Sequence, residues 1–155
     1  MDALLEKAAQ SIAEAAGWKK PHAAADGSFS FSLEGNLDFT MLSPDGKTGI
    51  LLAQLGEAPE VQSPQEGADL ERIASLAAGV LRSRNSVLSI SDQNILELHR
   101  SFSLRESQGP QLLGIARDFL NDFAWWKKQL EKRGQPSRFS GTGMVFDFPI
   151  NWFQG

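Results

Sequence analysis

The spacing of hydrophobic residues predicts a helix at the start of the chain. Apolar side chains recur there every three or four positions, as they do along one face of an amphipathic helix. They are Leu4, Leu5, Ala8, Ile12 and Ala16. Gly17 follows, and glycine often ends a helix because it adopts the left-handed conformation without strain. We therefore expect a helix over residues 1–16.

From residue 28 the hydrophobic period changes to two, which is the period of a strand with one apolar face. The alternating apolar residues are Phe29, Phe31 and Leu33, and after a turn Leu37, Phe39 and Met41. The segment Ser43-Pro44-Asp45-Gly46 predicts a second turn, because proline and glycine stand at favoured turn positions. A third strand is expected over residues 48–55, where Ile50-Leu51-Leu52 predicts burial on both faces. Together these strands predict an antiparallel meander.

A loop over residues 56–67 precedes a second predicted helix over residues 69–82. The apolar face of this helix consists of Leu70, Ile73, Ala77, Val80 and Leu81. Its small residues Ala74, Ala78 and Gly79 would allow another body to approach closely. A hairpin is predicted next, with strands over residues 86–91 and 95–104 and a turn at residues 92–94.

Residues 110–132 predict the longest helix, with Pro110 in its first turn. Its apolar face is formed by Leu112, Ala116, Phe119, Phe123, Trp126 and Leu130. Trp125 instead falls on the polar side with Asp118 and Asp122, where a neighbouring loop could cover it.

Residues 134–155 differ in composition from the rest of the chain. They are rich in aromatic residues, whereas a solvated disordered tail should be poor in them. We expect this tail to dock as an irregular or extended segment on its own domain or on a partner subunit.

The order helix, three strands, helix, two strands, helix predicts an α+β fold, with an antiparallel twisted sheet and helices packed on it. We expect one such domain over residues 1–133 and the aromatic-rich tail over residues 134–155.

Composition and charge limit the classes of function that the chain can have. The chain has 155 residues, no cysteine and a formal net charge of −4, so thiolate chemistry is excluded and the charge argues against a nucleic-acid partner. It shows no signal-peptide pattern and no apolar run near the roughly 20 residues of a membrane span. We expect a soluble, cytoplasmic protein.

Candidate catalytic patterns are weak. The segment Gly46-Lys47-Thr48 lacks the earlier glycine of a phosphate-binding loop and leads into a strand rather than a helix. Glu97 and His99 alternate on one strand face and could touch, but two residues are too few for a metal site and have no evident nucleophile beside them. We therefore expect no enzyme, no cofactor and no metal.

Apolar residues of the first helix and first strands are numerous, and for most of them burial under the helices is the simpler interpretation. A subset exposed as a groove would form a peptide-binding site.

The order of elements resembles the class I chaperones of bacterial type III secretion. The resemblance spans residues 1–133 and rests on five segments: Leu4-Leu5 with Ile12, Phe29-Ser30-Phe31, residues 37–41, residues 69–82 and residues 94–104. The aromatic tail is not a usual feature of that family.

The resemblance implies a homodimer that binds the N-terminal segment of a secreted effector and keeps it ready for secretion, with a secretion ATPase as a further partner. It implies effector pockets at Leu4, Leu5, Ile12, Phe29, Phe31, Phe39 and Met41. It also implies a dimer interface at Leu70, Ile73, Ala74, Ala77, Val80 and Leu81. Two alternatives stay open, namely a regulatory or adaptor dimer of similar fold and a small enzyme with a site near Glu97 and His99.

Overall fold

A single antiparallel sheet of six strands is the centre of the computed structural model, which describes residues 3–60, 62–105, 107 and 109–131. The strand order is β1-β2-β3-β4-β6-β5. In chain order the elements are α1 (Ala3–Ala16), β1 (His22–Ala23), β2 (Phe29–Phe31), β3 (Phe39–Leu42), β4 (Thr48–Glu57), α2 (Pro64–Val80), β5 (Val87–Ile90), β6 (Ile95–Ser103) and α3 (Gly109–Glu131). The predicted α+β fold is confirmed.

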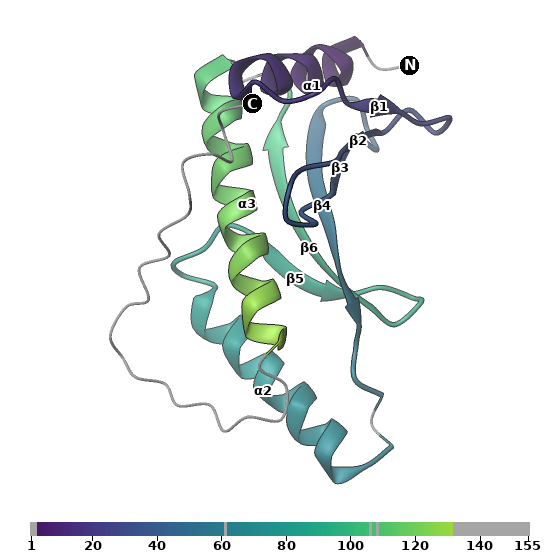
Figure 1. Cartoon of the computed structure of the whole chain (residues 1–155), viewed down its shortest axis with the longest axis vertical. Coiled ribbons are helices and arrows are strands. Elements are labelled where there is room, and N and C mark those ends of the chain that lie inside the picture. Colours follow the sequence, from purple (N-terminus) through teal and green to yellow (C-terminus); the bar gives the residue numbers. More distant parts are fainter. Residues whose placement is uncertain (1–2, 61, 106, 108, 132–155) are drawn as a thin grey trace.

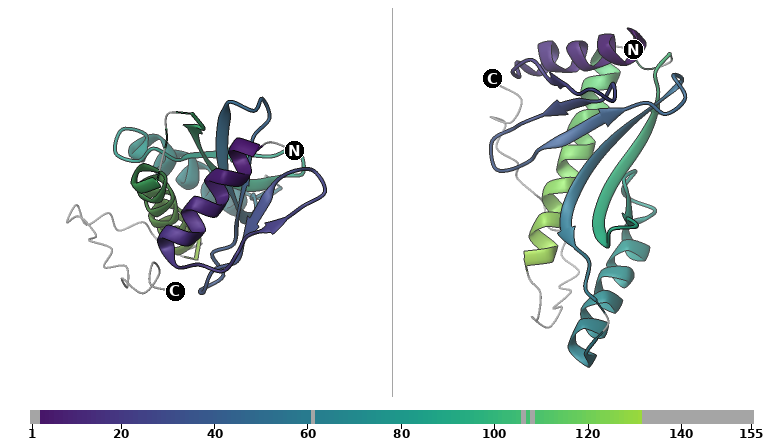
Figure 2. Two further views of the ribbon diagram at one scale, coloured as in Figure 1. Left: turned by 90° about the horizontal axis from the view of Figure 1, so that it is seen from above. Right: turned by 90° about the vertical axis from the view of Figure 1, so that its right-hand side faces the viewer.

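Helices α1 and α3 pack on one face of the sheet, and α2 lies at the end of the molecule opposite α1 (Figure 1 and Figure 2). Alternate residues of the long strands β4 and β6 are buried beneath α3, among them Leu51, Ala53 and Leu98. Aromatic rings fill the space near α1, where Phe31 and Phe39 stack with centroids 4.7 Å apart. The period-two pattern of the sequence thus corresponds to one closely packed face.

The opposite face of the sheet is partly open to solvent. The register of β4 and β6 places Leu52 beside His99 on this face. Ile50 and Leu52 are half-buried, whereas Leu51 between them is fully buried. The prediction of burial on both faces of this strand therefore holds only in part.

Helix α2 begins earlier than predicted, at Pro64, inside the expected loop over residues 56–67. The Oγ atom of Ser63 accepts a hydrogen bond from the Glu66 backbone N–H at 3.2 Å and so caps the helix. The helix ends at Val80 rather than at residue 82. The segment Ser63-Pro64-Gln65-Glu66 is a helix-start signal that the apolar periodicity does not reveal.

Strand β1 is absent from the sequence prediction, which had three strands before α2 rather than four. Its two residues pair with β2, His22 with Ser30 and Ala23 with Phe29. Two residues are too few to show a period, so only the pairing reveals the strand.

Trp125 is buried although it lies on the polar side of α3. The guanidinium of Arg84, in the connection between α2 and β5, lies 4.6 Å from the centroid of its ring. A residue of this connection therefore covers the ring, and a loop was one possible cover for a tryptophan on this side of the helix.

The aromatic tail over residues 134–155 lies outside the described residues, as do residues 1–2 and 132–133. The docking of the tail and the division into a domain and a tail therefore stay predictions.

Candidate functional site

A groove of about 330 Å³ lies between α1 and the segment that joins β6 to α3. The two walls come from parts of the chain about a hundred residues apart in sequence. The lining residues are Leu4, Lys7, Ala8, Ser11, Leu104, Arg105, Ser107, Gly109 and Leu112.

The groove has apolar side chains in its depth and charges at its edge. Ala8, Leu104 and Leu112 are buried, while Leu4 is 38% exposed. Lys7 and Arg105 are exposed, and α3 begins at Gly109 with the positive end of its helix dipole. The arrangement suits an apolar side chain that is followed by a carboxylate or by backbone carbonyl groups.

Only one of the predicted effector-binding residues, Leu4, lines this groove. The other six are buried, which agrees with the simpler interpretation that most of these residues form the core. They are Leu5, Ile12, Phe29, Phe31, Phe39 and Met41. Their part in effector binding stays a prediction.

A second apolar surface lies at the end of α2 and along β5. Four large hydrophobic side chains of the described residues are exposed, and apart from Leu4 they are Leu81 at 60%, Ile90 at 50% and Val87 at 41%. Strand β5 is at the edge of the sheet and pairs only with β6 among the described strands. Such an edge offers unpaired backbone groups to another chain.

The predicted dimer residues differ in their exposure. Ile73 is buried within the chain's own core, and Leu70, Ala77 and Val80 are half-buried. Ala74 and Leu81 are exposed. Only Ile73 and Leu76 are buried in α2, so most of this helix remains available to a partner.

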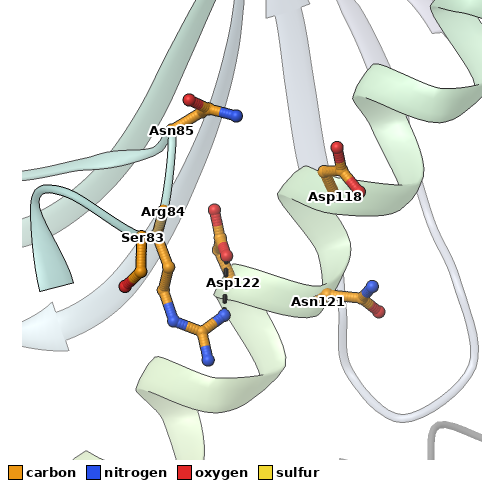
Figure 3. A pocket seen from close by; sticks show the side chains of 6 residues that line it. All are labelled: Ser83, Arg84, Asn85, Asp118, Asn121 and Asp122. Atoms are coloured by element: carbon orange, nitrogen blue, oxygen red, sulfur yellow. Dashed lines mark hydrogen bonds and ion pairs between the residues drawn. The ribbon is translucent and has the colours of Figure 1, made fainter.

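A polar pocket of about 350 Å³ lies where the connection between α2 and β5 meets α3, and Figure 3 shows the side chains that line it. The Asp122 carboxylate lies with the other polar side chains at this pocket. It forms an ion pair with Arg84 at 2.7 Å and accepts a hydrogen bond from the Ser86 hydroxyl at 2.5 Å. Because these partners satisfy the buried carboxylate, the cluster acts as an anchor that fixes β5 and the preceding connection against α3.

Glu97 and His99 share one strand face, as predicted, and both are half-buried on the more open face of the sheet. In the register, His99 stands between Leu52 of β4 and Val87 of β5, so its cross-strand neighbours are aliphatic. The described part of the chain contains no group of three or more acidic or histidine side chains that could hold a metal ion. Among the same residues, no helix is long and apolar enough to cross a bilayer.

Residues 7–127 match the family model of the Tir chaperone protein (CesT) family. The chain belongs to the Tir chaperone protein (CesT) family. The sequence-based resemblance to type III secretion chaperones is thereby confirmed.

Solved structures with the same fold include secretion chaperones captured with other proteins. The chain of the HopA1-SchA chaperone-effector complex is 11% identical, with a TM-score of 0.62 over 82% of this CesT family member and 95% of that chain. The ExsC-ExsE complex gives 15% identity and a TM-score of 0.60, over 84% and 97% of the two chains. The Yersinia pestis type III secretion chaperone SycH, in complex with a fragment of YscM2, gives 10% identity and a TM-score of 0.56, over 81% and 98%. No curated protein sequence matches significantly.

Most groove residues of this CesT family member were not predicted from the sequence. Lys7 lies on the polar side of the first predicted helix, and Arg105 and Ser107 lie between the predicted strand over residues 95–104 and the predicted helix over residues 110–132. No periodicity could reveal them, because the groove exists only after α1 packs beside the start of α3.

Proposed function

We propose that this chain is a type III secretion chaperone that binds the N-terminal segment of a secreted effector and keeps it soluble and competent for secretion. The observation that carries the proposal is the groove beside α1, which has a buried apolar floor, an open mouth and two cations at its edge. Membership of the CesT family supports the same function.

The mechanism is binding alone. An apolar side chain of the effector would cover Leu104 and Leu112, while Lys7 or Arg105 would meet a neighbouring carboxylate or carbonyl group. The free energy comes from apolar area removed from water, so neither a nucleotide nor a catalytic residue is required. The complex would form in the cytoplasm, before a secretion ATPase engages it.

We also propose that the chaperone is a homodimer whose interface includes the outer side of α2 and strand β5. Leu81, Val87 and Ile90 expose apolar surface there, and the small side chains of Ala74 and Ala77 allow a close approach. A second copy would cover this surface, because large exposed apolar patches on soluble proteins are commonly interaction sites.

Effector binding can be tested by co-expression with the N-terminal segments of candidate secreted effectors. Ser11→Trp places a large ring in the groove and should abolish co-purification of the effector. Gln10→Trp, on the exposed side of the same helix, is the matched control and should leave co-purification intact. Equal retention of the effector by both variants would show that the groove is not its binding site.

The dimer can be tested by light scattering over a dilution series. The wild-type chain should have the mass of a dimer, and the double variant Leu81→Glu/Val87→Glu should have the mass of a monomer. Ala15→Glu, on the exposed face of α1, should remain dimeric. A dimer that captures no effector segment would instead favour the regulatory or adaptor protein.

A further inference from the structure

The lining of the groove beside α1 defines the chemistry of an occupant that would fit it. Its depth is apolar at Leu104 and Leu112, and its rim carries the cations Lys7 and Arg105. A matching segment would place bulky apolar side chains around a single carboxylate.

The chain's own C-terminal segment has this composition. Residues 144–150 read Met-Val-Phe-Asp-Phe-Pro-Ile, so that Asp147 stands between two phenylalanines. Asp147 is also the only charged side chain in residues 139–155, and its sign is opposite to that of Lys7 and Arg105. Charge and hydrophobicity therefore both complement the groove.

The distance can be covered by the residues that precede this segment. Helix α3 starts at the groove with Gly109 and ends at Glu131, and its 23 residues correspond to about 34 Å. An extended chain covers roughly 3.3 Å per residue, so about ten residues return to the groove. Residues 132–143 provide this length and contain three glycines, at positions 134, 141 and 143.

We infer that residues 144–150 of this chain dock over the groove between α1 and the start of α3, with an apolar side chain inside it, and must be displaced before an effector binds. The displacement rests on the proposed chaperone function, whereas the docking of the segment does not. A tethered segment competes at an effective concentration near the millimolar range, so it lowers the apparent affinity of an effector that enters the same groove. The segment would keep the apolar groove covered until an effector is available.

Disulfide trapping provides a clean test because the chain contains no cysteine. One cysteine replaces Ser11 in the groove, and a second replaces Thr142, Met144 or Asn151 in turn. The matched control keeps the second cysteine and moves the first to Ser83, which is exposed in the connection between α2 and β5. Mild oxidation should form an intramolecular disulfide at least ten times faster with Ser11→Cys than with Ser83→Cys. Equal rates, or disulfides that form only between chains when single-cysteine variants are mixed, would overturn the inference.

Effector capture separates the inference from the proposed function. Phe146→Ser/Phe148→Ser should remove the selective trapping and raise the apparent affinity for an effector segment at least threefold. Lost trapping with unchanged effector affinity would refute the displacement. Selective trapping in a chain that captures no effector would leave the docking in place and refute the chaperone function instead.

Discussion

Removal of the Asp122 carboxylate should destabilise the packing of the connection between α2 and β5 against α3. Asp122 is 5% exposed, and it holds both the Arg84 guanidinium and the buried Ser86 hydroxyl. Asp122→Ala would leave the Ser86 hydroxyl without this acceptor and the guanidinium without its counter-charge. Both changes are unfavourable because buried polar groups lose their hydration on folding.

The size of the effect follows from the exposure of the two partners. Loss of one partner of a buried ion pair costs about 3–5 kcal/mol. The Arg84 side chain is 23% exposed and can recover part of its hydration, so we expect a value near the lower limit, about 3 kcal/mol. For a chain of this size, that loss lowers the melting temperature by roughly 6–12 °C.

Asp118 offers a matched control one helical turn earlier on α3. Its carboxylate lies 3.5 Å from the Arg100 guanidinium, but its side chain is 61% exposed. The Arg100 side chain is 15% exposed and loses its counter-charge in Asp118→Ala, but the pair is longer and its carboxylate is hydrated, so the variant should cost only about 1 kcal/mol.

Denaturant unfolding of both variants measures the two free energies. Hydrogen exchange should also show faster opening of residues 81–86 in Asp122→Ala, because the anchor of this connection is lost. Equal unfolding free energies for the Asp122 and Asp118 variants would refute the assignment of an anchor.

Three further predictions concern the strands and α2. Gly49→Ala would place a Cβ atom 2.7 Å from Cε1 of Phe102, so we expect the free energy of unfolding to fall by about 1–3 kcal/mol, as measured with denaturant. Adding Phe102→Leu should restore much of this loss. A loss that the second change does not reduce would argue against the ring contact. The backbone N–H groups of Thr48 and Lys47 donate to the Asp45 carboxylate and hold its pKa below the ordinary value of 3.8. Because the folded pKa is lowered, the contribution of Asp45 to stability is present above pH 3.8 and disappears as the pH falls through the folded pKa. The difference in unfolding free energy between wild type and Asp45→Asn should therefore shrink in acid, and a difference that does not change with pH would contradict this. Ser63→Ala removes the cap of α2 and should cost about 1 kcal/mol, with faster hydrogen exchange in its first turn, whereas the exposed Ser75→Ala in the same helix should leave that turn unchanged.

The sequence by itself determined the class of fold and most of its elements. Phe29, Phe31, Phe39 and Met41 alternate with polar residues, and they are all buried on one face of the sheet. This agreement has a simple cause, since an amphipathic strand or helix must bury its apolar face whatever its partner is. The same patterns supported the resemblance to secretion chaperones, which the family match confirms.

Tertiary structure decided where apolar surface stays open. Leu4 and Leu5 are neighbours in one apolar stretch of sequence, yet Leu5 is 2% exposed and Leu4 is 38% exposed. Helix α1 packs with Leu5 in the core, and Leu4 lines the groove. The partners of Asp122 lie 36 and 38 residues away in sequence, so no local pattern could identify this carboxylate as an anchor. Periodicity records which face of an element is apolar, but only the packing of distant elements decides which part of that face is covered and which remains free to bind.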